Sequence, residues 1–232
     1  MIGHVARALG GRGLLLDVGC GYGFFSREAQ RMGFVVESIE IAPAERDIAS
    51  AMLNQEPLDL EFEDFPERTR AHDAILMSQV LEHAVDPRAW IAKAARLLRP
   101  GGILCVAVPN FGSFLRHALQ GKDPYIAPPM HLNYFSRNNL TRLLASEELT
   151  TFRAETVSRV RPDALSRRAP QWLRAPLLLD SAVRQGQRLP FAAIDRIGLG
   201  MFLNIYSTRN AAITETSRPK VEEIHGTTAA AR

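Results

Sequence analysis

The sequence has little cysteine and no long apolar run. Its 232 residues include two cysteines, Cys20 and Cys105, and both fall where we predict buried strand or a strand end. Two cysteines so placed form neither a disulfide framework nor a metal-site spacing, which is typical of a reducing compartment. No window approaches the roughly 18 apolar residues that cross a bilayer, and the first 13 residues lack the apolar stretch of a signal peptide. We therefore expect a cytoplasmic protein.

Net charge is also small. The formal net charge of +3 does not by itself indicate a nucleic-acid partner, and we expect none. The hydrophobic fraction of 46% and the charged fraction of 23% are ordinary for a soluble globular chain. The length suits one sizeable domain, which we place at residues 1–210. Residues 211–232 have no periodic pattern, and we predict a disordered tail there.

Strand and helix patterns alternate along the chain. The predicted strands are residues 14–18, 34–39, 58–62, 73–77, 103–108, 150–158 and 201–207. The predicted helices are residues 2–9, 24–32, 87–98 and 136–145, with another opening at Pro43. This alternation predicts an α/β fold, a doubly wound Rossmann-like sheet that is mostly parallel, with helices on both faces. Prolines before the last strand predict an insertion of short helices over about residues 159–198.

Three alternate glycines stand between the first strand and the next helix, in LLLDVGCGYGFFSREAQRMGF (residues 14–34). Gly19, Gly21 and Gly23 allow a sharp turn and a close ligand approach, because no Cβ intervenes. The dinucleotide fingerprint G-x-G-x-x-G aims a helix N-terminus at a pyrophosphate. Here the third glycine comes one position early, Phe24 takes its place, and Asp17 would repel a pyrophosphate. A cofactor with a cationic amino-acid head and no phosphate, such as S-adenosylmethionine, suits this loop better.

Acidic segments follow the next three strands. Glu40 ends the second strand, at the distance where an acid binds ribose hydroxyls in such folds. Its two carboxylate oxygens can accept from both hydroxyls. EFEDFP (61–66) and SQVLEH (78–83) follow the third and fourth strands, where carboxyl ends of parallel strands border a ligand crevice.

These motifs together resemble the class I S-adenosylmethionine-dependent methyltransferases, over roughly residues 10–158, with 201–207 similar to their last strand. The matching stretches are LLDVGCGYG, VESIEIAP, EFEDFP, HDAILMSQVLEH, LLRPGGILCVAVPN and MHLNYFS. The resemblance implies S-adenosylmethionine as cofactor and a seven-stranded sheet whose final strand is antiparallel.

The resemblance also implies roles for single residues. Those implied for the methionine part of the cofactor are Asp17, Gly19, Gly21 and Gly23. Those implied for the ribose and adenine are Glu40, Ile41, Glu61 and Phe62, with Asp64 replacing Glu61 if the register differs. Those implied for the cofactor floor are Ser78 and Gln79.

The resemblance raises the question of a metal. Relatives in ubiquinone-pathway O-methylation use a Glu followed by a Glu-His pair as a metal site. The corresponding residues here are Gln79, Glu82 and His83. The first acid is missing, so a hard oxygen ligand for magnesium is lost. We therefore predict no metal.

Two histidines are candidates for a catalytic base. Methyl transfer is an in-line displacement in which alignment matters most, and a base helps when the nucleophile is a hydroxyl. His131 lies in a long loop after the fifth strand and has a side chain that titrates near neutral pH. A structural histidine in that turn-rich loop is an equally good interpretation. His83 is the second candidate, and Asn133 and Tyr134 could line the acceptor pocket.

The acceptor is left open by the sequence. Residues 151–190 hold eight arginines against three acidic residues, among them Arg161, Arg167, Arg168 and Arg174. Such a cluster fits an anionic or lipid-linked acceptor or a peripheral membrane contact, and equally a solvated helical insertion. Little sequence precedes the first strand, so cover for the acceptor site would come from this insertion or from residues upstream of Met1.

The function favoured is methyl transfer to a small molecule, at oxygen, with carbon and nitrogen acceptors left open. The first alternative is methylation of RNA or protein, although the Asn-Pro-Pro-Tyr type motif of many amino-nitrogen methyltransferases is absent after the fourth strand. The second is a non-catalytic S-adenosylmethionine-binding module, which only turnover would separate from an enzyme. A nicotinamide dehydrogenase is disfavoured by Asp17 and Phe24.

Overall fold

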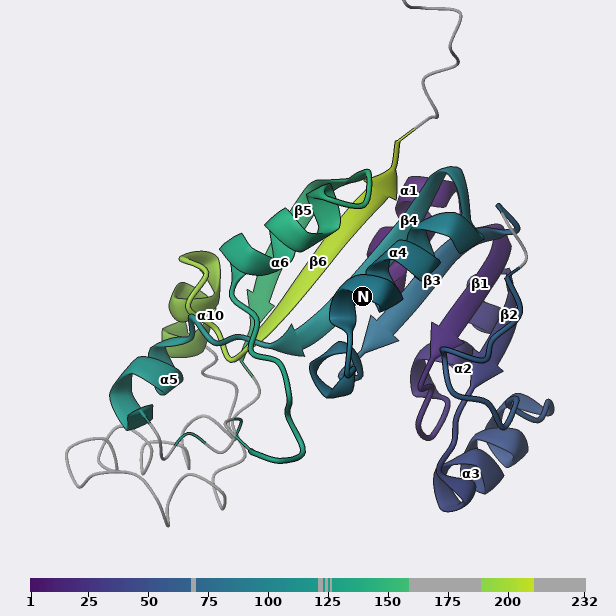
Figure 1. Cartoon of the computed structure of the whole chain (residues 1–232), viewed down its shortest axis with the longest axis horizontal. Helices are drawn as coiled ribbons and strands as arrows, with labels where there is room; N and C mark the ends of the chain where they lie inside the picture. The colour runs from purple at the N-terminus through teal and green to yellow at the C-terminus, as the bar shows by residue number, and fades with distance from the viewer. Residues whose placement is uncertain (68–69, 121–122, 124, 126, 159–188, 211–232) are drawn as a thin grey trace, which may run out of the picture.

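The computed structural model describes residues 1–67, 70–120, 123, 125, 127–158 and 189–210 (Figure 1). Most of the expected helical insertion and all of the expected tail lie outside these residues. Within them, no helix has both the length and the apolar character needed to cross a membrane.

Six strands form one mixed sheet in the described part of the chain. They are β1 (Gly13–Val18), β2 (Phe34–Ile39), β3 (His72–Ser78), β4 (Leu98–Pro109), β5 (Leu149–Val157) and β6 (Phe202–Arg209). Their order is β2-β1-β3-β4-β6-β5. The pairs among β1 to β4 are parallel, whereas β6 runs antiparallel to both of its neighbours. The predicted antiparallel final strand is therefore confirmed.

Helices connect and cover the strands. They are α1 (Ile2–Leu9), α2 (Phe24–Arg31), α3 (Pro43–Leu53), α4 (Pro87–Leu97), α5 (Phe114–Leu119), α6 (Arg137–Ala145) and α10 (Leu189–Arg196), with a 3₁₀ turn η1 (Leu81–His83). Local signals explain where they begin. The Asp86 carboxylate accepts from the Ala89 N–H at 3.0 Å, directly before Pro87 at the first position of α4.

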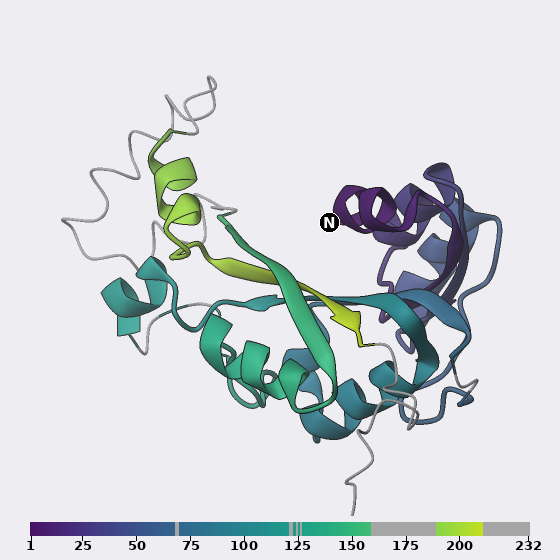
Figure 2. The ribbon, with the colours of Figure 1, turned by 90° about the horizontal axis from the view of Figure 1, so that it is seen from above.

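The helices lie on both faces of the sheet (Figure 2). Side chains of α1 and α2 share one apolar cluster with Leu15 and Leu76, and side chains of α4 and α6 share the other with Leu16 and Ile75. Neighbouring strand residues join opposite clusters because successive side chains point to opposite faces. Burial on both faces explains why the parallel strands read as continuous apolar runs.

The predicted strand at 58–62 is wrong. Leu58 alone forms a parallel bridge with Ile39, in which its N–H donates to Ser38 O at 2.8 Å and its carbonyl accepts from the Glu40 N–H at 3.0 Å. Phe62 and Phe65 are both buried, and side chains three residues apart point to opposite faces of a strand. The chain therefore turns here, and the expected seventh strand is reduced to one bridge.

Candidate functional site

The glycine loop between β1 and α2 has the backbone that its composition predicts. Gly19, Gly21 and Gly23 have φ angles of 63°, 54° and 78°, in the left-handed region that favours glycine. A Cβ on Gly19 would lie 2.5 Å from Val80 Cγ1, whereas a Cβ on Gly21 would meet no atom within 4 Å. Gly19 is thus needed for packing, and Gly21 leaves free space above the loop.

Glu40 fastens this loop to the end of β2. One carboxylate oxygen accepts from the Gly21 N–H at 2.8 Å, and the other accepts from the Ala42 N–H at 2.9 Å. Each oxygen keeps a further lone pair for a ligand donor. Glu40 therefore has a structural role in addition to the predicted ribose contact.

Asp17 lies beneath the loop and is 1% exposed. The Ser26 hydroxyl of α2 donates to its carboxylate at 2.6 Å. Burial raises the pKa of Asp17 to about 7, although the Ser26 hydrogen bond opposes the rise and the nearby Glu40 charge adds to it. Asp17 does not line the cavity described next, so it supports the loop from below.

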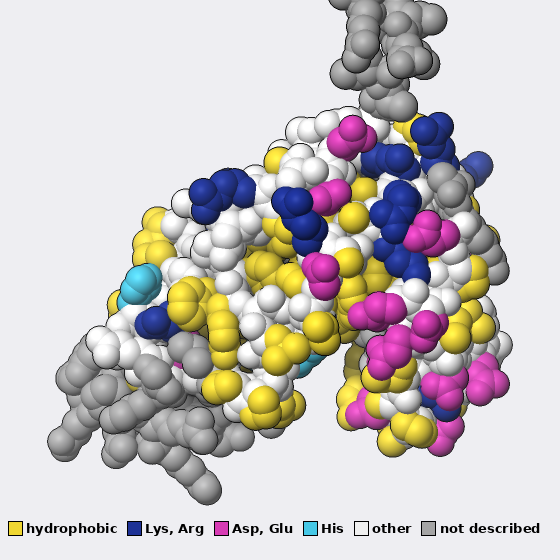
Figure 3. All heavy atoms as spheres, in the orientation of Figure 1, with side chains coloured by type: hydrophobic (Ala, Val, Ile, Leu, Met, Phe, Trp, Pro, Cys, Tyr) yellow, Lys and Arg dark blue, Asp and Glu magenta, His cyan; other side chains and the backbone are white. Residues whose placement is uncertain are grey.

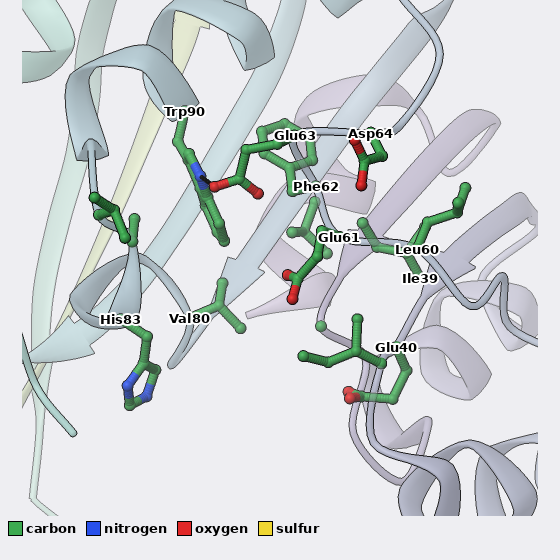
Figure 4. A pocket seen from close by; sticks show the side chains of 15 residues that line it. Ile39, Glu40, Leu60, Glu61, Phe62, Glu63, Asp64, Val80, His83 and Trp90 are labelled. Atoms are coloured by element: carbon green, nitrogen blue, oxygen red, sulfur yellow. Dashed lines mark hydrogen bonds between the residues drawn. The ribbon is translucent and has the colours of Figure 1, made fainter.

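A cavity of about 600 Å³ opens beside the loop at the carboxyl ends of β1, β2 and β3, a size typical of small-molecule sites (Figure 4). The structure brings together six of the residues predicted for the site. They are Gly19, Glu40, Ile41, Glu61, Phe62 and His83.

Acidic side chains dominate the polar lining of this cavity. Glu40, Glu61, Glu63 and Asp64 line it, and no lysine or arginine among the described residues does. Asp and Glu side chains gather along one wall of the notch between the β1–β2 side and the η1–α4 side (Figure 3). Because a cleft lined by one sign of charge concentrates the opposite sign, it attracts a cation and repels a pyrophosphate. Glu61 and Asp64 both reach the cavity, so the predicted alternative between them stays open.

Leu60 and Trp90 also line the cavity, and neither belongs to a motif that the sequence analysis named. The Trp90 ring of α4 packs edge-on to Phe62 with centroids 5.2 Å apart, and its Nε1–H donates to Glu63 at 2.7 Å. Phe62 is 2% exposed, so its ring forms the wall behind Trp90 and leaves little surface for contact with an adenine. A tryptophan within an amphipathic helix looks like an ordinary core residue, which is why the sequence did not identify it.

Ser78 and Gln79 do not line this cavity. They border a second hollow of about 310 Å³, on the face of the sheet that α1 and α2 cover. Gln79 has a φ of 61°, and its N–H donates to the Ala107 carbonyl at 2.8 Å. This turn directs Gln79 and the next residue, Val80, to different hollows.

The two candidate histidines lie together. The rings of His83 and His131 pack edge-on with centroids 5.0 Å apart. His131 Nδ1 donates to the Tyr125 carbonyl at 2.9 Å, and His83 Nδ1 donates to the Met130 carbonyl at 2.7 Å. A carbonyl can only accept, so both Nε2 atoms keep a free lone pair.

Glu82 completes this group. One donor atom from each of Glu82, His83 and His131 lies within 4.8 Å of the others. Glu82 is buried, one of its oxygens has no hydrogen-bond partner among the described residues, and burial raises its pKa to about 7. One carboxylate and two imidazoles do not form the oxygen set that magnesium prefers, although they could hold a zinc-type ion. The absence of a metal stays a prediction.

The loop that carries His131 is fixed to η1. The Asn133 side chain donates to the Ala84 carbonyl at 2.6 Å, and the backbone N–H groups of Leu132 and Asn133 donate to the Glu82 carbonyl at 2.9 and 3.0 Å. Asn133 and Tyr134 border a space of only about 10 Å³, too small for an acceptor. His117 is exposed.

Comparison with known proteins agrees with this geometry. The sequence profile of a family described as a methyltransferase domain matches residues 4–151. A ubiquinone biosynthesis O-methyltransferase of Caulobacter vibrioides is 33% identical over 41% of this chain and 40% of its own length. The match thus spans about two-fifths of that relative.

Two solved structures are similar in fold. An S-adenosylmethionine-dependent methyltransferase of Thermotoga maritima, a possible histamine N-methyltransferase, has a TM-score of 0.60 at 21% identity, covering 85% of this chain and 82% of that one. The 1,6-didemethyltoxoflavin-N1-methyltransferase of Burkholderia thailandensis, solved with S-adenosylhomocysteine, has a TM-score of 0.59 at 16% identity, covering 90% and 76%.

Asp17→Asn should remove a pH dependence of stability. The folded-state pKa of about 7 exceeds the ordinary 3.8, so between these values the folded state keeps a proton that the unfolded state loses. The free energy of unfolding therefore falls by about 1 kcal/mol per pH unit as pH rises through this window. The substitution should abolish this decrease. Urea denaturation between about pH 5 and 8 measures this. The exposed Asp47→Asn is the control, and equal slopes for wild type and Asp17→Asn would contradict the raised pKa.

Proposed function

The chain belongs to the methyltransferase-domain family and is a class I S-adenosylmethionine-dependent methyltransferase, and on this premise we propose that it binds S-adenosylmethionine in the acidic cavity and methylates a small-molecule acceptor at oxygen. The observation that carries the proposal is the set of four carboxylates, without a lysine or arginine from the described residues, beside the glycine loop. The O-methyltransferase activity of the named Caulobacter relative supports oxygen as the methylated atom.

The cavity offers a partner for each part of the adenosine. The free lone pairs of Glu40 would accept from the ribose hydroxyls. Ile41 is 49% exposed at the cavity and would pack on the adenine. Glu61 or Asp64 would accept from the adenine amine.

The charge of the cavity suits the reaction. The sulfonium of S-adenosylmethionine is a cation, and methyl transfer turns it into a neutral thioether. A wall of carboxylates attracts the cationic donor more strongly than the neutral product, which favours exchange after each turnover. The main task left to the protein is to align the acceptor oxygen with the methyl group.

His131 is the proposed general base. Its Nδ1–H is held by the Tyr125 carbonyl, so Nε2 is the atom that would take the proton of an acceptor hydroxyl. His83, edge-on to it, also lines the donor cavity. A base beside the donor cavity would act without a metal.

Gly21→Val should abolish cofactor binding. A β-branched residue is strained at a φ of 54°, and its side chain would occupy the free space above the loop. Calorimetry with S-adenosylhomocysteine measures the effect. Gly10→Val is a matched control, because Gly10 has a φ of 72° and also faces open space but caps α1 far from the cavity. Retained affinity in Gly21→Val would contradict the assignment.

Glu40→Gln should weaken binding of S-adenosylhomocysteine nearly as much as Glu40→Ala. The Gln side chain has one acceptor oxygen, so its amide N–H₂ must face the Gly21 or the Ala42 N–H, both donors. We expect a loss of about 1–3 kcal/mol, with no binding of NAD to any form. The exposed Glu56→Gln is the control in the same calorimetric titration. An affinity for Glu40→Gln equal to that of wild type would reject the role of the carboxylate.

His131→Ala should lower methyl transfer by about 10²–10⁴-fold and leave affinity for S-adenosylhomocysteine unchanged. Release of S-adenosylhomocysteine with catechol as acceptor measures the rate. Treatment of wild type with EDTA should leave this rate as it was. If EDTA abolishes the rate and zinc restores it, His131 is a metal ligand together with Glu82 and His83.

A further inference from the structure

The hollow bordered by Ser78 and Gln79 lies at the carboxyl ends of the strands, on the face opposite α4 and α6. Its volume is about 310 Å³, and Met1 of the α1 end and Phe25 of α2 border it on one side. Strands β4, β5 and β6 contribute the rest of its lining.

Strand pairing brings four lining side chains into one row. Ser78 of β3 pairs with Ala107 of β4, Ala107 pairs with Asn204 of β6, and Asn204 pairs with Glu155 of β5. Directly paired residues point to the same face of a sheet. The row therefore presents one continuous surface built from four segments that are distant in the sequence.

A second row lies beyond the first. Phe202 pairs with both Pro109 and Val157, two residues further along each strand, so these side chains point to the same face. On the other side of the first row, the row that contains Tyr206 is covered by α1. There the His4 ring packs edge-on to the Tyr206 ring, with centroids 5.4 Å apart. Phe202 and Val157 line the hollow and give it an apolar floor.

Apart from Glu155, the polar side chains that line the hollow are uncharged and make few hydrogen bonds to described residues. Asn204 is 6% exposed, and its side-chain amide makes no hydrogen bond to any described residue. The Ser78 hydroxyl likewise has no partner there, and Gln79 uses only its amide N–H₂, which donates to the Ala107 carbonyl at 3.1 Å. A nearly buried amide without a partner is costly unless a ligand or water meets it.

The one acid among the described residues of the hollow is already paired. Glu155 accepts from the Tyr206 hydroxyl and from Arg153, both at 2.8 Å. Burial alone would raise the pKa of Glu155, but these hydrogen bonds outweigh it and lower the pKa. No lysine or arginine side chain from the described residues lines the hollow. A charged ligand would find no free counter-charge among these side chains.

The hollow adjoins the donor cavity through one short turn. Val80 lines the donor cavity, and the two residues before it line the hollow. If the donor binds against Val80, its methyl group would therefore face the hollow across the Ser78–Val80 turn.

We propose that this hollow is the acceptor subsite and that it selects an uncharged molecule with an apolar, ring-sized body and one hydroxyl or amide group. Asn204 and Ser78 bind the polar group, and Phe202, Val157 and Phe25 hold the body. The inference rests on the proposed function, since it assumes that S-adenosylmethionine is the donor. It differs in charge from the anionic acceptor that the arginines suggested; Arg161, Arg167, Arg168 and Arg174 lie outside the described residues.

The test uses two fluorinated probes of similar size, one uncharged and one anionic. 4-Fluorophenol and 4-fluorobenzoate are each titrated with the full chain saturated with S-adenosylhomocysteine, and binding is followed by ¹⁹F line broadening. We expect 4-fluorophenol to bind at least about tenfold more tightly than 4-fluorobenzoate, because the carboxylate is desolvated without a partner.

Asn204→Leu is the decisive variant. It keeps the volume and removes the amide, so it should weaken 4-fluorophenol by about three- to tenfold, the equivalent of one hydrogen bond. Affinity for S-adenosylhomocysteine, measured by calorimetry, should not change. Asn138→Leu is the matched control, because Asn138 is exposed on α6. If Asn204→Leu does not fold, Val157→Phe tests the same hollow, and should exclude the probe by filling it.

Every other outcome contradicts the proposed selectivity, the assignment of the hollow to the acceptor, or the proposed function. Equal binding of both probes, or no binding of 4-fluorophenol, overturns the selection for an uncharged acceptor. A loss of S-adenosylhomocysteine affinity in Asn204→Leu assigns the hollow to the methionine part of the donor instead. Failure of wild type to bind S-adenosylhomocysteine at all rejects the proposed function, and is recognised before any probe is added.

Discussion

The link between Glu40 and the glycine loop is the interaction on which the rest of the site depends. Three left-handed glycines make a loop that few side-chain contacts could hold, since it has hardly any side chains of its own. The Glu40 carboxylate replaces those contacts with two hydrogen bonds to backbone N–H groups, one in the loop and one beyond β2. A charged acceptor makes such bonds stronger than a neutral one would. Together with the Cys20 N–H, which donates to the Ile39 carbonyl at 3.0 Å, this side chain sets the position of the loop and hence the width of the cavity.

That link has an electrostatic cost, which shapes the cavity. The Glu40 charge lies near the buried Asp17 and contributes to its raised pKa, after burial itself. Glu61, Glu63 and Asp64 add further negative charge across the opening. Like charges gathered without a lysine or arginine among the described lining residues are unfavourable in an empty site, and a cationic ligand relieves them. The same acidity would therefore contribute affinity for the proposed sulfonium donor.

Features of the fold and of the site could be predicted from the sequence where the contacts that determine them are local. The glycine turn, the Asp86–Pro87 helix start and the antiparallel last strand were predicted correctly, because each follows from neighbouring residues or from a motif resemblance. The strand at 58–62 was not, because Phe62 and Phe65 are both drawn into the core from a segment whose alternation is weak. The side to which Gln79 points could not be predicted either, since its positive φ occurs together with a backbone hydrogen bond to Ala107, which is distant in the sequence.

The residues of the second hollow show the same limit most clearly. Asn204 follows a run of apolar residues near the end of the chain, and in the sequence nothing separates it from a polar residue on an exposed strand face. Its environment arises only when β6 inserts between β4 and β5, which brings Ala107 and Glu155 to either side of it. The antiparallel insertion that completes the sheet is thus also the step that creates the hollow. Under the proposed function, the methyltransferase fold would fix where the donor binds, and the side chains of three strand ends would decide what lies opposite the methyl group.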